Sequence, residues 1–278
     1  MNRFEISQLI YKAIKDKEDK LKEQFATSSN DIGYFFIDDL LPEEITLRIF
    51  NKFPNISQTR QKKSLKEFKH VAAQMDQYDP LLEEVIYAFQ EPKVVHLIAS
   101  ICKLEKVYPD SHLYAGGISM MGQGNYLQPH LDNSHDKDRK QWRVLNLLFY
   151  ITPDWNPKNG GNLELWPNGV KGKPLTIDAR FNRLVIMATH KKSWHSVSKV
   201  TTDRVRCCVS NYYFSNHPLD NKESFHVTTF RARPGQSFQN QLLKIDAQLR
   251  MAVRKVFSKG IVKNPHVYHK PDAKKNPE

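Results

Sequence analysis

Residues 129–132 read Pro-His-Leu-Asp, and this stretch decides how the rest of the chain is interpreted. Side chains two residues apart on a β-strand project from the same face, so His130 and Asp132 can reach a common point. A His-x-Asp triplet alone carries little information in a chain with 11 histidines. Its surroundings must therefore show whether the two side chains bind a metal.

The first surrounding feature is His195, which lies far enough downstream for several strands to fold back and bring it beside the triplet. Two imidazoles and one carboxylate on one face of an octahedron leave three coordination positions open. This arrangement suits non-haem Fe(II) oxygenases. We therefore predict that His130, Asp132 and His195 are metal ligands. Two other histidines remain as weaker alternatives, His190 in a lysine-rich turn and His135 on a polar loop.

The second feature is a strand-like segment that opens at Arg206, on which Arg206 and Ser210 share one face. A buried guanidinium needs an anion, and its planar fork pairs well with a carboxylate. We predict that Arg206 binds the distal carboxylate of 2-oxoglutarate, with the Tyr150 and Ser210 hydroxyls as helpers. Tyr150 is the last residue but one of the apolar run 143–151, a predicted central strand. Arg204 stays open as a competitor for the role of Arg206.

Several motifs occur in a fixed order along this part of the chain. They are His130-x-Asp132, Tyr150-x-x-x-Asp154-Trp155, Gly160-Gly161-Asn162-Leu163-x-Leu165-x-Pro167, Phe181-Asn182-Arg183-Leu184, His195-x-Val197, and Arg206 with Tyr212 six residues later. From about Ile118 to Phe214 the sequence thereby resembles the Fe(II)/2-oxoglutarate oxygenases of the prolyl 4-hydroxylase type. A tyrosine that this family carries before the first ligand falls near Met120, so the resemblance leaves the substrate open.

The resemblance implies an enzyme that uses Fe(II), 2-oxoglutarate and O2, with ascorbate as a further candidate reductant. It assigns the same metal ligands and the same co-substrate residues as the strand pattern. The implied reaction is hydroxylation of an unactivated C–H bond, with a peptidyl or prolyl side chain as the first substrate class. The alternatives are a hydroxylase of a small molecule or saccharide, a nucleic-acid-directed oxygenase, and a non-catalytic jelly-roll binding module.

The composition is that of a globular protein, with 40% hydrophobic and 26% charged residues among 278. No stretch approaches the roughly 20 apolar residues of a membrane span, and the cysteine count of three is odd. Both observations predict a cytoplasmic protein. The formal net charge of +12 would suit an anionic partner, whether 2-oxoglutarate, an acidic protein, a nucleic acid or a membrane surface, or would serve solubility alone.

Short strands bounded by Gly, Pro and Asn begin near Tyr114 and predict a double-stranded β-helix, or jelly roll, with helices packed outside it. We expect a single oxygenase domain over 1–278 with four parts. These are an N-terminal helix (1–28), a strand and helices that support the barrel (29–112), the jelly-roll catalytic core (113–216), and a C-terminal strand with a basic helix (217–278).

Two segments outside the core have open roles. The polar, basic stretch 55–69 is either a mobile loop that faces the substrate or a solvated connection. A helix is predicted from Ser237 to about Lys259, with Gly260 and Pro265 ending it. Its basic face could contact an anionic partner or membrane, or its apolar stripe could simply cover a sheet. That stripe consists of Leu242, Ile245, Leu249, Ala252, Val253 and Val256.

Overall fold

The computed structural model describes residues 1–220, 222–257 and 267–268. The helices are α1 (Arg3–Lys15), α2 (Glu18–Ser28), α3 (Glu43–Phe50), α4 (Pro80–Ala88), α5 (Pro92–Ile101) and α6 (Ser237–Val256), with short 3₁₀ turns η1 (Ile56–Gln58), η2 (Met75–Gln77) and η3 (Pro157–Asn159). The strands are β1 (Tyr34–Ile37), β2 (Arg60–Lys63), β3 (Glu67–Ala72), β4 (Tyr108–Pro109), β5 (Gly117–Met121), β6 (Tyr126–Leu131), β7 (Trp142–Tyr150), β8 (Leu163–Leu165), β9 (Leu175–Ile177), β10 (Arg183–Ala188), β11 (His195–Val197), β12 (Arg206–Ser215) and β13 (Thr229–Phe230).

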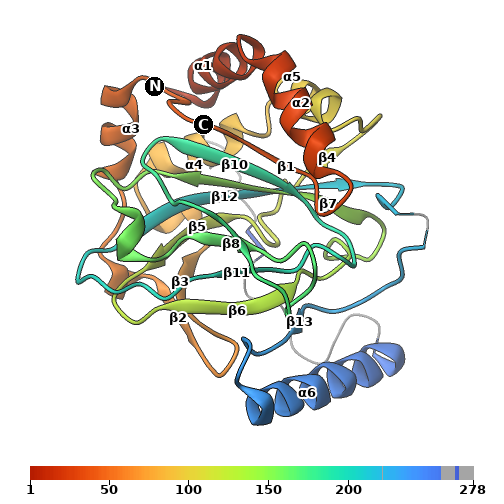
Figure 1. The fold of residues 1–278 in the computed structure, drawn as a ribbon. Helices are drawn as coiled ribbons and strands as arrows, with labels where there is room; N and C mark the ends of the chain where they lie inside the picture. Colours follow the sequence, from red (N-terminus) through yellow and green to blue (C-terminus); the bar gives the residue numbers. More distant parts are fainter. Residues whose placement is uncertain (221, 258–266, 269–278) are drawn as a thin grey trace, which may run out of the picture.

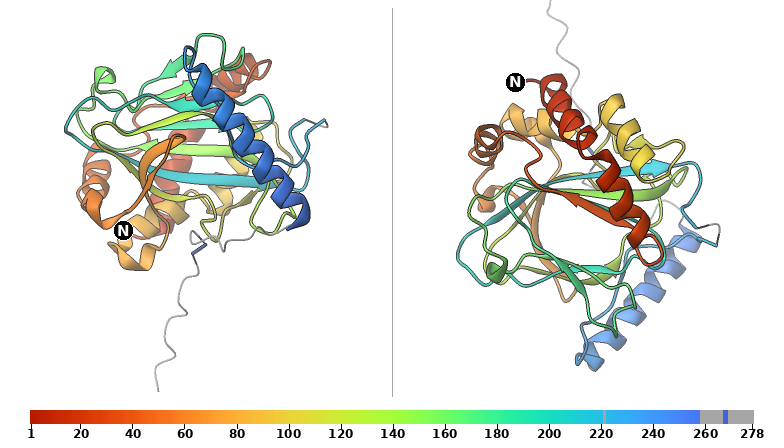
Figure 2. Two further views of the ribbon diagram at one scale, coloured as in Figure 1. Left: turned by 90° about the horizontal axis from the view of Figure 1, so that it is seen from below. Right: turned by 45° about the horizontal axis from the view of Figure 1, so that its top comes forward.

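Within the described residues all 13 strands join one antiparallel sheet that curls on itself (Figures 1 and 2). The main strand order is β1-β10-β7-β12-β5-β3-β6-β11-β8-β9, and β13, β2 and β4 pair with strands of this path. Helices α1 to α5 cover one outer face of the curled sheet, whereas α6 lies on the opposite side, beside β6 and β13 (Figure 1). This is the double-stranded β-helix that the sequence predicts, and the fold prediction is confirmed.

Strand β7 shows how the sheet separates the helical layer from the barrel interior. Leu145, Leu147 and Phe149 belong to the larger hydrophobic cluster, which includes the buried faces of α1, α4 and α5. The alternate residues Leu148 and Tyr150 pack in the smaller cluster inside the barrel. Because β7 is buried on both faces, its sequence is almost continuously apolar rather than alternating. Tyr150 therefore points into the barrel, as the strand pattern predicts.

The N-terminal segment was expected to be one helix within residues 1–28, and this expectation is wrong. The structure has two helices, α1 and α2, which are separated at Asp16 and Lys17. The break lets the two helices pack on different elements, because α1 lies against α4 and α5 and α2 lies along β1. Tertiary packing thus overrides a helical pattern that is continuous in the sequence.

The basic stretch 55–69, expected to be a loop or a solvated connection, contains regular structure. It contains β2 and the start of β3, which form an antiparallel hairpin with Lys62 opposite Lys69. Strand β3 also pairs with β5 and β6. These backbone hydrogen bonds hold a strongly polar segment in the sheet, which its side-chain pattern does not reveal.

Helix α6 is present, but its predicted apolar stripe does not cover the sheet. Ile245 is 53% exposed and Leu249 is 63% exposed, whereas Leu243 on another face of the helix is 2% exposed. The helix contacts the body through Leu243 and Ala247. The part of this prediction that concerns Lys259, Gly260 and Pro265 lies outside the described residues.

No helix in the described part of the chain combines the length and the apolar character that crossing a membrane requires. The division of the chain into the four parts of one domain stays a prediction.

Candidate active site

Three ligand-type side chains meet where β6 lies beside β11. The strands are antiparallel with His195 opposite His130, and Asp132 directly follows β6. The ligand atoms of these three residues all lie within 4.8 Å of one another. Nε2 of His130 is 3.7 Å from Oδ1 of Asp132, and Nε2 of His195 is 3.8 Å from Oδ2 of the same carboxyl. This arrangement can place three donors around one metal ion.

Backbone carbonyls orient both imidazoles. Nδ1 of His130 lies 3.0 Å from the carbonyl oxygen of Gln128, and Nδ1 of His195 lies 2.9 Å from that of Ser193. Because a carbonyl oxygen can only accept, we assign the proton to Nδ1 in both rings, which leaves the Nε2 lone pairs for the common point. The Phe230 ring stacks on His130 with 5.0 Å between ring centres and further restrains its plane.

The charges at this point also suit a metal. Burial, followed by the nearby His195, lowers the pKa of His130 to about 3. Burial opposes ionisation of Asp132, but Arg143 and then the two histidines outweigh it and lower the pKa of this carboxyl to about 2. Nη1 of Arg143 lies 3.5 Å from Oδ2 of Asp132. At neutral pH the site therefore presents an ionised carboxylate and a neutral His130 imidazole, the forms that bind metals.

The ligands line a cavity of about 430 Å³ that also reaches Arg206. Arg206 is 4% exposed. Its Nη1 donates to the carbonyl oxygen of Gly161 at 3.1 Å, but its Nε has no hydrogen-bond partner among the described residues. A buried guanidinium with an unused donor is suited to an anion that binds in the cavity.

The Gly160-Gly161 pair explains how Arg206 fits against the cavity wall. Both glycines have positive φ, +74° and +70°. A Cβ on Gly160 would lie 1.9 Å from the carbonyl oxygen of Lys199, and a Cβ on Gly161 would lie 3.0 Å from Cδ of Arg206. Only glycine leaves room for this close approach without strain. The motif thus shapes the wall against which the guanidinium lies.

Tyr150 and Ser210 lie on the same side of the sheet as Arg206. Tyr150 is opposite Cys208 in the β7–β12 register, and Arg206 and Ser210 are two residues to either side of Cys208. The Tyr150 hydroxyl is buried without a hydrogen-bond partner among the described residues. Burial raises the pKa of Tyr150, although Arg206 opposes the shift, so the phenol stays neutral and can donate. These unpaired groups fit a bound carboxylate.

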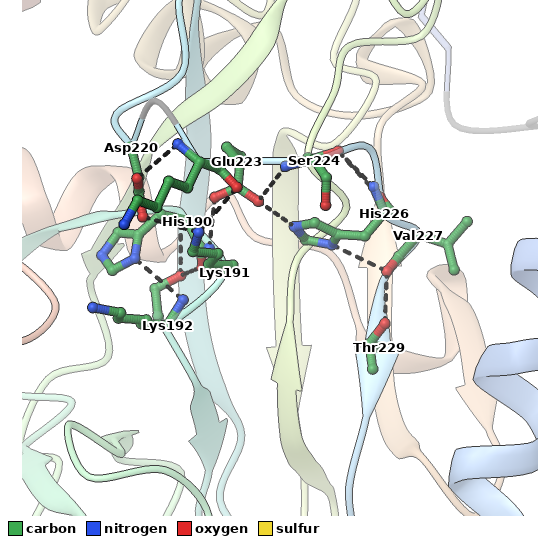
Figure 3. A network of polar contacts seen from close by, with 12 residues as sticks. His190, Lys191, Lys192, Asp220, Glu223, Ser224, His226, Val227 and Thr229 are labelled. Carbon is green, nitrogen blue, oxygen red and sulfur yellow. Dashed lines mark hydrogen bonds and ion pairs between the residues drawn. The ribbon is translucent and has the colours of Figure 1, made fainter.

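The structure separates the competing residues from the site. Nε2 of His190 lies 2.9 Å from the carbonyl oxygen of Ile32, and its Nδ1 accepts from the backbone of Lys192 at 3.2 Å. Figure 3 shows His190 in a polar network with Asp220 and Glu223, which joins the segment after β12 to the turn before β11. Both ring nitrogens are thus used away from the metal position.

His135 and Arg204, the other two alternative residues, also contact groups outside the site. Nε2 of His135 lies 3.0 Å from the Arg254 guanidinium of α6. Arg204 is exposed and donates to the carbonyl oxygens of Pro153 and Asp154 at 2.6 and 2.8 Å. Neither residue lines the cavity that contains His195 and Arg206.

Two buried polar residues of β7 line the cavity although neither was among the predicted site residues, Arg143 and Asn146. Arg143 contacts Asp132 and lies over the Tyr212 ring at 4.4 Å, and Oδ1 of Asn146 has no hydrogen-bond partner among the described residues. The available signal was a charged and a polar residue within the most apolar run of the chain. On β5, Ser119 and Met121 line the cavity, whereas Met120 belongs to the core under the helices.

Residues 116–214 match the model of the 2OG-Fe(II) oxygenase superfamily. This stretch is a 2OG-Fe(II) oxygenase domain. The predicted family resemblance, enzyme class and cofactors are therefore confirmed for this part of the chain. A prolyl 3-hydroxylase of Xenopus laevis, OGFOD1, is 31% identical over 84 residues, which cover 28% of this chain but 16% of that relative.

Two solved structures share the fold of the oxygenase domain. The carbocyclase SnoK of nogalamycin biosynthesis, described as non-haem and α-ketoglutarate-dependent, superposes with a TM-score of 0.53 at 14% identity, over 79% of this chain and 89% of that one. A 2OG-Fe(II) oxygenase-family oxidoreductase of Burkholderia pseudomallei gives a TM-score of 0.50 at 12% identity, over 74% and 94% of the two chains. At these identities the likeness concerns the fold.

Replacing Tyr150 with Phe in the oxygenase domain separates co-substrate binding from stability. We expect Tyr150→Phe to weaken 2-oxoglutarate binding roughly tenfold, because a hydrogen bond to a charged group is lost. The free energy of unfolding should stay the same or rise, because an unpaired buried hydroxyl is removed. Calorimetric titration with 2-oxoglutarate and urea unfolding measure the two quantities.

Tyr213 provides the matched control, because its buried hydroxyl donates to the carbonyl oxygen of Phe89 on the helical side of the sheet. Tyr213→Phe should lower the free energy of unfolding by about 1 kcal/mol and leave 2-oxoglutarate affinity unchanged. The same response in both variants would contradict a role for the Tyr150 hydroxyl in co-substrate binding.

Proposed function

We propose that the chain is an Fe(II)- and 2-oxoglutarate-dependent dioxygenase that hydroxylates an unactivated C–H bond of a peptidyl side chain, with proline the first candidate. His130, Asp132 and His195 would hold Fe(II), and Arg206 would hold the distal carboxylate of 2-oxoglutarate with Tyr150 and Ser210. One observation carries this proposal. Three ligand atoms within 4.8 Å of one another share a cavity with a buried arginine whose Nε is unpaired.

Bound Fe(II), with 2-oxoglutarate and O2, supplies the oxidising power that converts a C–H bond to an alcohol while the co-substrate becomes succinate and CO2. The chain's own residues orient the reactants. The carbonyl contacts of Gln128 and Ser193 hold the two imidazoles in place. Leu148, Leu163 and Val197 give the inner cavity an apolar wall that limits access of water.

The peptidyl substrate is supported by the partial match to a prolyl 3-hydroxylase. Because the match covers 16% of that protein, it supports only the choice of prolyl peptides as the first substrate class to test.

The test is succinate formation by the purified chain with Fe(II), ascorbate and 2-oxoglutarate, with and without a panel of proline-containing peptides. We expect basal succinate formation that depends on Fe(II), and a further rise with a peptide that gains one oxygen atom by mass spectrometry. Succinate formation that no metal stimulates would contradict the dioxygenase assignment. Stimulation by small molecules or nucleic acids but by no peptide would contradict the substrate class.

Two further predictions concern the cellular location of the protein and a binding partner of α6. A cytoplasmic location is supported by three cysteines that are all unpaired and buried. The prediction that α6 binds an anionic partner or a membrane surface has less support. Arg250 and Arg254 of this helix contact other parts of the protein, so that of its basic side chains Lys244 and Lys255 are the exposed ones.

A further inference from the structure

The cavity of the proposed active site has an excess of positive charge. Six cationic side chains line it, against two carboxylates. The carboxylates belong to Glu67 and Asp132, and the cations are Lys62, Lys66, Lys69, Arg143, Arg206 and Arg250. Such an excess inside a cavity raises the local concentration of anions and favours their binding.

Four of the six cations already have a carboxylate partner. Lys66 and Arg250 share Asp246 of α6, at 2.7 and 2.8 Å. Lys69 lies 3.0 Å from Glu67. The fourth, Arg143, is paired with Asp132, as described above. Arg206 and Lys62 remain, and neither has an ion pair among the described residues.

The proposed cofactor and co-substrate do not remove this excess. The two positive charges of Fe(II) and the two negative charges of 2-oxoglutarate cancel, and the distal carboxylate of the co-substrate is assigned to Arg206. The ammonium group of Lys62 therefore remains available when both are bound. The substrate, which would occupy the same cavity, is the molecule that can neutralise it.

Lys62 lies in the wall of the cavity that the substrate would occupy. It lies on β2 directly opposite Lys69 of β3, and both side chains line the cavity. Its neighbour Lys63 is exposed, lies over the Phe68 ring at 4.8 Å and does not line the cavity. Partial burial, followed by repulsion from Lys69, lowers the pKa of Lys62 to about 8, so it is mostly protonated at neutral pH.

We propose that Lys62 binds an acidic side chain of the peptide substrate, next to the residue that is hydroxylated, and so selects acidic peptides. This inference rests on the proposed function. A nucleic acid is the less favoured anion, because proteins bind single strands by stacking bases on accessible aromatic rings. Four aromatic side chains of the described residues line the cavity, Tyr114, Tyr150, Tyr212 and Phe230, and each of them is buried or half-buried rather than exposed.

The experiment measures peptide affinity without turnover, by calorimetry on protein loaded with Mn(II) and 2-oxoglutarate. The probes are three unlabelled peptides in which a central proline is flanked by Glu, by Gln or by Lys. We expect the Glu peptide to bind about tenfold more tightly than the Gln peptide, which corresponds to one charge-assisted contact. Lys62→Gln should abolish this preference, and Lys62→Arg should keep most of it. Lys63→Gln, with the same charge change one residue away, should leave it intact.

Three results would overturn the inference. The wild-type protein could show no preference for the Glu peptide, or the preference could survive Lys62→Gln. A single-stranded oligonucleotide could also bind more tightly than the Glu peptide in a Lys62-dependent way, which would assign the site to nucleic acid. Titration of 2-oxoglutarate into the Mn(II)-loaded protein, before any peptide is added, tests the proposed function separately from the acidic-peptide inference. If 2-oxoglutarate binds normally but charge has no effect, only the acidic-peptide inference fails, whereas absence of 2-oxoglutarate binding overturns the proposed function and this inference with it.

Discussion

His195→Ala is expected to lower the affinity of the protein for Fe(II) by more than about a hundredfold. Replacing residues that merely support a ligand weakens metal binding roughly 10- to 100-fold, and His195 is itself a proposed ligand. Its Nε2 faces the Asp132 carboxyl at 3.8 Å, so the variant removes one of three donors from the common point. Anaerobic titration of Fe(II), or of Mn(II) as a redox-stable substitute, measures the loss directly, and succinate formation should disappear in parallel.

His190→Ala is the matched control, because it removes the same type of side chain from the turn five residues earlier. Both nitrogens of His190 contact backbone atoms of Ile32 and Lys192, so this variant should bind metal normally. If metal affinity depended on His190 and not on His195, then His190 would be the third ligand and our assignment of His195 would be wrong.

Arg206→Ala should weaken 2-oxoglutarate binding by about a hundredfold or more. Truncation of a buried, hydrogen-bonded charge leaves the opposite charge without a partner and has large effects on binding. Lysine is a poor replacement, because it lacks the planar fork that pairs with a carboxylate. Arg206→Lys should therefore recover only part of the affinity. Calorimetric titration of 2-oxoglutarate in the presence of Mn(II) gives both values, and metal affinity in the absence of 2-oxoglutarate should change little.

Arg204→Ala tests the alternative co-substrate arginine, which lies two residues before Arg206. The Arg204 guanidinium is held by the carbonyl oxygens of Pro153 and Asp154 outside the cavity, so its loss should leave 2-oxoglutarate affinity unchanged. The opposite pattern, with Arg204 essential and Arg206 dispensable, would refute the co-substrate assignment.

The strand-based part of the site was predictable because it depends on local geometry. Residues at even spacing on a strand share a face wherever the strand lies. The sequence therefore grouped Arg206 with Ser210 and put Tyr150 in the interior, and the β7–β12 register agrees with both placements. The metal position needed one further step, because His195 comes from another strand. The order of motifs predicted that strand, and the β6–β11 pairing places His195 opposite His130.

Helical patterns were less informative, because they show that a stripe exists but not what it faces. The apolar stripe of α6 was expected to cover a sheet, yet Leu249 is 63% exposed. The helix is held instead by its buried residues Leu243 and Ala247 and by polar contacts such as the ion pair of Asp246 with Lys66. Similarly, the single helix that was predicted within residues 1–28 is interrupted at Asp16 and Lys17, a break for which the sequence contains no strong signal.

The sequence by itself determined the fold class, the three ligand-type residues and the buried arginine, because strand periodicity and ordered motifs are properties of short segments. Only the tertiary structure decided what surrounds them. The contact of Arg143 with Asp132, the place of Lys62 in the cavity wall and the outward face of α6 all depend on segments that are far apart in the chain. Such contacts depend on how the sheet curls and how its edges pair, which no local pattern records.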